Sequence, residues 1–194
     1  MDLAAPAYGL TLFDLLALFV VAGFVVLGFV QGPVRRALGI VLATLILLVA
    51  MNLRAPIGTW LAGYWVRDSP AYSEMFAFGA TFAILFATAT LAAQIYVKPM
   101  ALFPARQLAN ELLGGVLGLV EGVIVLAAVL LILDTYFRTA NPAASPNELS
   151  VLRSFFRFYD DSTTAHVCRQ SLDPALFWAF GWITPEAVRQ ALGR

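Results

Sequence analysis

The feature that most limits the fold of this chain is a set of four apolar segments, each long enough to cross a membrane. They run over about 11–30, 34–53, 75–97 and 112–133. A helix needs about 20 mostly apolar residues to cross a hydrocarbon layer of roughly 30 Å. Charged residues make up only 12% of the chain, against about 25% in a typical soluble domain. The sequence therefore excludes an ordinary soluble domain and predicts an all-α membrane protein with four transmembrane helices.

These segments divide the chain into three parts. We expect an N-terminal tail over 1–10, a membrane domain over 11–137 and a C-terminal tail over 138–194 that carries short amphipathic helices. The second segment is expected to end before Pro56, because proline removes a backbone hydrogen bond from a helix. A cleaved signal peptide is the alternative for the first segment. Residues 1–34 contain no Lys or Arg, whereas a signal peptide needs a basic start, so we expect a true span.

Composition also excludes several kinds of site. Lys plus Arg and Asp plus Glu both number 12, so no global charge field attracts nucleic acid. The single cysteine, Cys168, has no partner for a disulfide, and one histidine is too few for a Cys/His zinc site. No hydrolase or metalloprotease motif is present. We expect no catalytic residue, no cofactor and no metal, and we expect His166 and Cys168 to be solvated loop residues.

Basic residues do not by themselves fix the orientation, because the predicted loops on the two sides of the membrane carry equal numbers of them. The N-terminal tail has no basic residue, however, while Arg35 and Arg36 directly follow the first span. The first helix usually dominates orientation, and basic loops stay in the cytoplasm. We therefore expect both termini to lie outside the cytoplasm.

Small residues form stripes on the predicted spans. In the last span glycines recur every four residues, and in the first span two glycines share a face with an aspartate: Gly114, Gly118 and Gly122, then Gly28, Gly32 and Asp14. Lipid gives helices no hydrophobic reason to associate, so close backbone approach through small residues matters. We predict that helices of one chain pack on these faces. Contact between copies of the chain and chance spacing are the alternatives.

Glu121 is the most notable ionisable residue, because it interrupts the last span. A charge at the bilayer centre costs roughly 2.5–3.5 kcal/mol on insertion scales, so such residues are functional candidates. One hypothesis is a proton- or cation-sensing carboxyl. The alternatives are a neutral acid, hydrogen-bonded to Gln94 or Thr88, that fixes helix register, and a carboxyl at the headgroup level.

Two further acids stand near span ends. Asp14 is one turn inside the first span, and we expect it to be hydrated. Asp134 ends the last span and is spaced for an acid-before-base pair with Arg138, worth a few tenths of a kcal/mol.

The C-terminal tail has the pattern of short amphipathic helices. Ser145 is suited to cap a helix start, with Glu148 completing a capping box. The following face is aromatic and apolar: Leu152, Phe155, Phe156 and Tyr159. We expect this face to lie on the membrane surface, with Trp178 and Trp182 as interface aromatics, while a partner-binding surface is the alternative.

Three motifs occur in a familiar order. They are Asp14 at the start of the first span, the loop 28–39 with Gly28, Gly32 and Arg35, and the span from Gly114 to Asp134. Together they resemble the colicin V production protein family over about 11–137. Gln31 stands where that family usually has Arg, Arg36 where it has Glu, and Asn110-Glu111 where an Asp-Arg pair is common. Any charge network among those positions is therefore altered in this chain.

The resemblance implies a small four-span protein of the bacterial inner membrane, associated with colicin V export and envelope maintenance. We accordingly expect a non-enzymatic protein whose termini are periplasmic. Its expected partners are the lipid bilayer and other membrane proteins or a second copy of the chain. The alternative function is a small transporter or channel subunit that couples through Glu121 or Asp14.

Overall fold

The computed structural model of the protein describes residues 11–64, 70–97, 102, 106–140, 155 and 159–170. Its long elements are four helices: α1 (Leu12–Gln31), α2 (Pro33–Ala62), α3 (Pro70–Tyr96) and α4 (Gln107–Ala140). Each of them is long and apolar enough to cross a membrane, and no strand occurs among the described residues. The prediction of an all-α protein with four transmembrane helices is confirmed.

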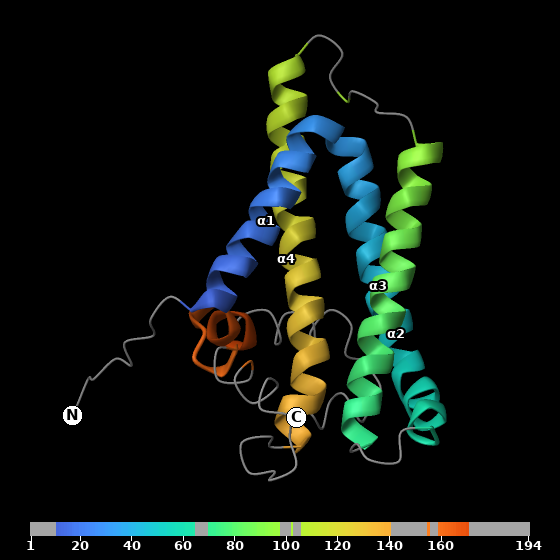
Figure 1. The fold of residues 1–194 in the computed structure, drawn as a ribbon. Coiled ribbons are helices and arrows are strands. Elements are labelled where there is room, and N and C mark those ends of the chain that lie inside the picture. The colour runs from blue at the N-terminus through green and yellow to red at the C-terminus, as the bar shows by residue number, and fades with distance from the viewer. Residues whose placement is uncertain are drawn as a thin grey trace, which may run out of the picture.

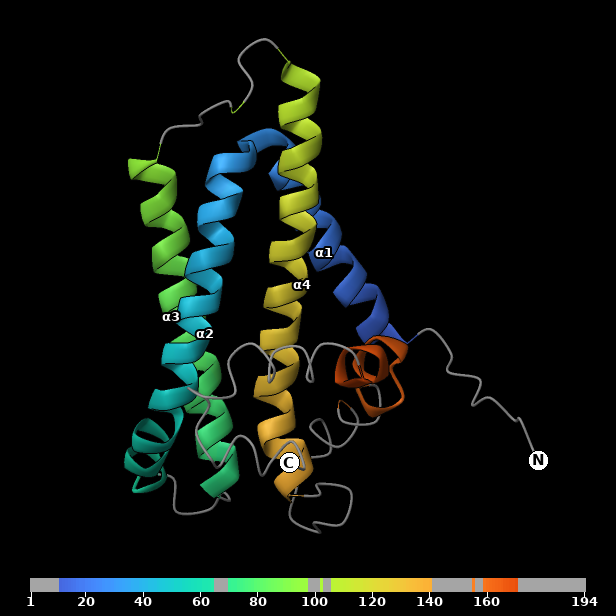
Figure 2. The ribbon, with the colours of Figure 1, turned by 180° about the vertical axis from the view of Figure 1, so that it is seen from behind.

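α4 lies at the centre of the bundle, with α1 on one side and the paired α2 and α3 on the other (Figures 1 and 2). α1 is inclined, so that it crosses α4 near the α1–α2 turn and diverges from it toward the opposite end (Figure 1). Leu47 and Phe78 belong to the core cluster that joins α2, α3 and α4.

The reversal between α1 and α2 takes a single residue, Gly32. Its φ of 79° lies in the left-handed region that L side chains rarely adopt. The Gly32 N–H donates to the Gly28 carbonyl over 3.0 Å, which closes the end of α1. Pro33 then occupies the first position of α2, where its missing N–H has no cost.

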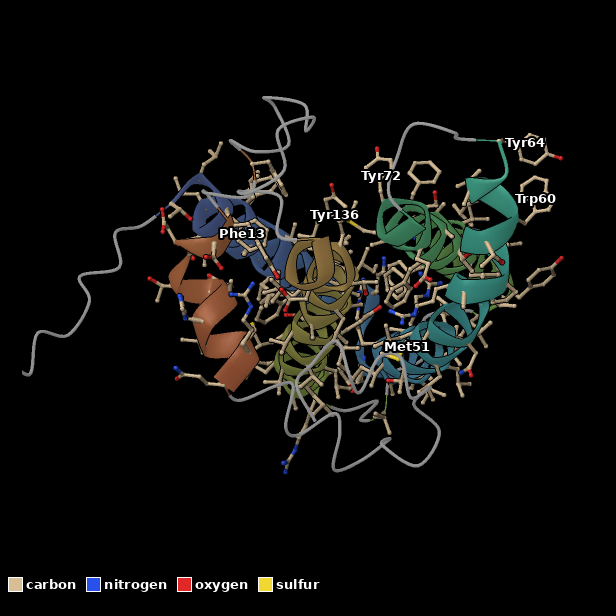
Figure 3. All side chains as sticks on the ribbon, turned by 90° about the horizontal axis from the view of Figure 1, so that it is seen from below. Phe13, Met51, Trp60, Tyr64, Tyr72 and Tyr136 are labelled. Carbon is tan, nitrogen blue, oxygen red and sulfur yellow. The ribbon has the colours of Figure 1, made fainter. Side chains whose placement is uncertain are left out.

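α2 continues through Pro56 to Ala62, so the expectation that it ends before Pro56 was wrong. Proline removes one helical hydrogen bond, and the neighbouring turns still hold the helix, which bends instead of stopping. The end of α2 turns away from the line of the helix (Figure 1). Trp60 lies in this last part of α2, and Tyr64 lies in the turn that follows it (Figure 3). Their rings lie 5.0 Å apart, and both side chains are exposed, as suits aromatics at a membrane boundary.

The predicted glycine face of α4 packs against α1. A Cβ at Gly114 would meet the Gly28 carbonyl, and a Cβ at Gly118 would meet the Phe24 carbonyl. A Cβ at Gly122 would lie 3.0 Å from the Phe24 Cβ. The glycines therefore let two backbones of the same chain touch, and this face is not available to a second copy.

Residues 159–170 fill the space between the diverging ends of α1 and α4 (orange in Figures 1 and 2). Tyr159 has no exposed surface and meets Phe13 edge to face, with ring centroids 5.3 Å apart. Leu130 and Tyr136 of α4 belong to the same core cluster, and Tyr136 also contacts Tyr72 of α3 (Figure 3). The expectation that Tyr159 lies on the membrane surface was wrong, because α1 and α4 diverge and leave an apolar gap that this segment fills.

Some of the other residues singled out in the tail are described by the structure, and some are not. Cys168 is buried and lies in the short helix over 163–170, so it is not a solvated loop residue; His166, in the same helix, is half-buried. Phe155 is 38% exposed. The remaining predicted tail features lie outside the described residues: Ser145, Glu148, Leu152, Phe156, Trp178 and Trp182.

Candidate functional site

The bundle contains buried polar clusters near both ends, and the first joins α2 to α4. Arg36, in the first turn of α2, places Nη1 2.6 Å from Oε2 of Glu121. Both residues are buried, 5% and 4% exposed. Arg36 also donates to the Gln31 side-chain oxygen over 2.8 Å and lies 5.7 Å from the centroid of the Phe24 ring. Glu121 is thus an ion-paired carboxylate, held by a residue of another span.

A glycine makes room for this pair. A Cβ at Gly39 would overlap the Glu121 carboxylate, so the acid approaches the α2 backbone only because that position has no side chain. Thr88 donates instead to the Ile84 carbonyl and is exposed. The hydrogen-bond partner of Glu121 among the described residues is therefore Arg36 and not Gln94 or Thr88, because α2 brings a guanidinium to the carboxyl group.

The first cluster also contains two positions at which the sequence departs from the pattern of the family that it resembles. Gln31 and Arg36, which stand where the family usually has Arg and Glu, contact each other. In this chain a neutral acceptor at Gln31 and a carboxylate from α4 hold the Arg36 guanidinium. Arg35, next to it, donates to the carbonyls of Gln94 and Val97 at the end of α3.

The second cluster fixes the tail segment to the end of α4. Arg169 binds Asp134 through two hydrogen bonds, from Nη2 to Oδ1 over 2.7 Å and from Nε to Oδ2 over 3.2 Å. The Tyr159 hydroxyl donates to the same carboxylate over 2.7 Å. Sequence spacing predicted Arg138 as the partner of Asp134. The partners that the structure describes come from the tail instead, and the side chain of Arg138 is not among the described ones.

The pKa values of Tyr159 and Arg169 are shifted so that both groups keep the protons that they donate to Asp134. Burial and the adjacent Asp134 carboxylate raise the pKa of the Tyr159 phenol well above its usual range. Burial acts to lower the pKa of Arg169, but the hydrogen bonds and charge interactions with Asp134, Tyr159 and Asp160 together outweigh it, and the pKa is raised. Tyr159 therefore stays a neutral donor and Arg169 stays charged.

Asp14 belongs to a third cluster, at the start of α1. Its Oδ2 accepts from the Thr11 backbone N–H over 2.9 Å, and Thr11 caps the helix in return. Its Oδ1 accepts from the Ser162 hydroxyl over 2.7 Å and from the Thr164 N–H over 2.8 Å. Asp14 is 6% exposed, so the expectation of a hydrated residue was wrong; the tail segment covers it.

A fourth cluster, which sequence reasoning missed, surrounds Arg54 near the bend of α2. This arginine is 3% exposed and lies 3.8 Å from the Glu74 carboxylate of α3. It also donates to the Thr135 hydroxyl of α4 over 3.3 Å. The sequence did contain a signal for this pair, because Arg54 follows the end of one apolar segment and Glu74 precedes the start of the next.

These clusters lie at two levels of the bundle. Arg36 and Arg54 are separated by about 27 Å of α2, at about 1.5 Å per residue. The partners of Arg36 and Arg54 come from α3 and α4. The two clusters therefore fix how far α3 and α4 are displaced along α2. Within the described part of the chain, no group of three or more His, Cys, Asp or Glu residues is placed to hold a metal ion. The chemistry of these clusters is positioning of helices by paired charges.

Comparison with known proteins gives one match. The sequence model of the family described as Colicin V production protein matches residues 13–169. No curated protein and no solved structure matches the chain. The matched range includes α2, α3, α4, all of α1 except its first residue, and nearly all of the described tail segment.

Proposed function

Because the chain belongs to the colicin V production protein family, we propose that it is a non-enzymatic protein of the bacterial inner membrane that serves toxin production or export and envelope homeostasis. In this proposal it acts by contacting other membrane components. Its fold supplies a rigid membrane bundle whose outward residues are apolar, including Phe19 on α1 and Ile84 on α3.

The observation that carries this proposal is the pairing of the buried carboxylates. Glu121 is held by Arg36, Asp134 by Arg169, and Asp14 by hydrogen bonds from the tail. A coupling carboxyl in a transporter must exchange its partner for a proton or ion, and a salt bridge buried on both sides resists that exchange. These contacts favour a structural role for the carboxylates over the alternative of a transporter coupled through Glu121 or Asp14.

We propose that the partners are the lipid bilayer and other membrane proteins or a second copy of the chain. The α1–α4 glycine face is occupied within the chain, so such contacts would use other surfaces. Crosslinking in native membranes followed by mass spectrometry tests this. A defined partner at constant stoichiometry supports the proposal, and recovery of the chain without any partner contradicts it.

We also propose periplasmic termini. Support comes from the missing basic residues before α1 and from the contact of Ser162 with Asp14, which puts the tail segment at the same end as the start of α1. Alkaline phosphatase fused after Arg194 is expected to be active. A fluorescent fusion that matures only in the cytoplasm is expected to stay dark, and bright fluorescence would overturn the orientation.

The functional test compares a deletion strain with strains that carry the wild type or Glu121→Gln. We expect the deletion to retain colicin V inside producing cells and to survive envelope stress poorly. If the carboxylate only positions helices, the secretion defect of Glu121→Gln should follow its loss of folded protein. Secretion lost at full protein level, together with ion flux by the purified wild type in liposomes, would favour the transporter.

A further inference from the structure

A small polar cavity lies beside the Arg36–Glu121 pair, where α2, α3 and α4 meet near the α1–α2 turn. Its volume is about 30 Å³. The lining combines polar side chains with an apolar wall: Gln31, Arg35, Arg36, Thr90, Gln94 and Glu121, then Gly39, Leu42, Phe86 and Ala93. A cavity of this size admits an oxygen-sized group, such as one water molecule, and not a whole organic ligand.

Two arginines that line the cavity carry hydrogen-bond donors that the protein does not use. The Nε atoms of Arg35 and Arg36 are buried and have no hydrogen-bond partner among the described residues. Arg36 is 5% exposed, so bulk water does not satisfy it. A buried donor without a partner is destabilising, and more so when the group is charged. Two guanidinium groups that border one cavity therefore have donor capacity left over, which favours an acceptor in that cavity.

The charges at the cavity are unbalanced. Arg35 and Arg36 contribute two positive charges, and Glu121 is the one acid among the lining residues. The hydrogen bonds of Arg35 go to neutral backbone carbonyls. One positive charge is therefore left over, which favours an anionic acceptor over a neutral water molecule.

The position of the cavity indicates which kind of anion can reach it. Arg35 and Arg36 occupy the first turn of a helix that is long and apolar enough to span a membrane, directly after the Gly32 reversal. Arginine side chains near the end of such a helix are expected to reach the level of the lipid headgroups. Gln94 of α3 both lines the cavity and is exposed at the surface. Leu42 and Phe86 form an apolar wall, which suits the beginning of an acyl chain.

We propose that this cavity binds the phosphate group of a membrane phospholipid. One phosphate oxygen enters the cavity beside the Arg35 and Arg36 guanidinium groups, which line it. The rest of the headgroup lies at the surface beside Gln94. The proposal goes beyond the proposed function, because it assigns a lipid site that holds whether or not the protein serves toxin export.

The test uses delipidated, full-length protein in detergent and follows the midpoint of thermal aggregation. Phosphatidylglycerol and phosphatidylcholine are expected to raise the midpoint, whereas diacylglycerol with the same acyl chains is not. Inorganic phosphate at the same concentration is expected to have little effect. A full shift with inorganic phosphate alone would overturn the lipid source, and an equal shift with diacylglycerol would overturn phosphate recognition.

Arg35 is the residue to change, because Arg36 also holds Glu121. Arg35→Gln is expected to raise the half-saturating phosphatidylglycerol concentration about tenfold, the effect of one lost charge-assisted hydrogen bond. Arg106→Gln removes the same charge from an exposed residue at the same end of the bundle and should leave that concentration unchanged. If Arg35→Gln does not fold, Arg35→Lys keeps the charge but has fewer donors, and its half-saturating phosphatidylglycerol concentration is expected to exceed that of the wild type. Equal phospholipid binding by the wild type and the folded Arg35 variant would overturn the site.

Discussion

The Glu121 carboxylate lies 2.6 Å from the Arg36 guanidinium, although 85 residues separate them along the chain. This contact joins the first turn of α2 to the middle of α4. Gly39 leaves the space for it, and Gln31 binds the other side of the guanidinium. The glycine contact between α1 and α4 and this ion pair therefore meet in one region of the bundle.

Removing one partner of this pair should destabilise the bundle. Glu121→Ala is expected to cost about 3–5 kcal/mol, because it leaves the Arg36 charge buried without a counter-charge. Glu111→Ala, on the same helix, removes only an exposed hydrogen bond to Gln107 and should be nearly neutral. Thermal aggregation in detergent measures both. The exchanged pair Arg36→Glu with Glu121→Arg should recover part of the loss, and no recovery would count against a direct ion pair.

Alanine should distinguish the two glycines of α1. A Cβ at Gly28 would overlap the Gly114 backbone, while a Cβ at Gly23 has no atom within 4 Å. We expect Gly28→Ala to lower the aggregation midpoint. Gly23→Ala should leave it unchanged or raise it slightly, because alanine favours helix by about 0.5–1 kcal/mol. Equal midpoints for the two variants would contradict the close α1–α4 crossing.

Alkaline pH should weaken the tail contact through Tyr159. The pKa of its phenol is raised above the ordinary 10.0 by burial and by Asp134. Above about pH 10 the unfolded chain loses this proton before the folded chain does, so stability falls as pH rises. The stability of the wild type relative to Tyr159→Phe should therefore decrease between about pH 9 and 11. A constant difference over this range would show that the phenol is not buried beside the carboxylate.

Cys168 reports directly on the attachment of the tail segment. It is the single cysteine of the chain and is buried beside α1 and α4. Maleimide labelling of the folded protein should be slow. Arg169→Gln removes the ion pair with Asp134 and should accelerate labelling several-fold, whereas Val167→Ala, at an exposed position of the same helix, should not. Fast labelling of the wild type would contradict the docked segment.

The sequence determined the elements because lipid imposes a local requirement. A hydrocarbon layer forces each buried backbone group to bond within its own helix, so long apolar segments had to be spans. The four-residue spacing of Gly114, Gly118 and Gly122 likewise predicted a face for close packing. Both inferences use only residues near each other in the chain.

The tertiary structure decided which residues meet. α1, rather than another helix or a second copy, covers the glycine face, and α2 brings Arg36 to Glu121. The tail converts Asp14 from an expected hydrated residue into a buried acceptor. Periodicity reports the face on which a residue lies, but a partner depends on how far one helix is displaced along another. That displacement is set by the combined contacts of distant segments, and no local pattern encodes it.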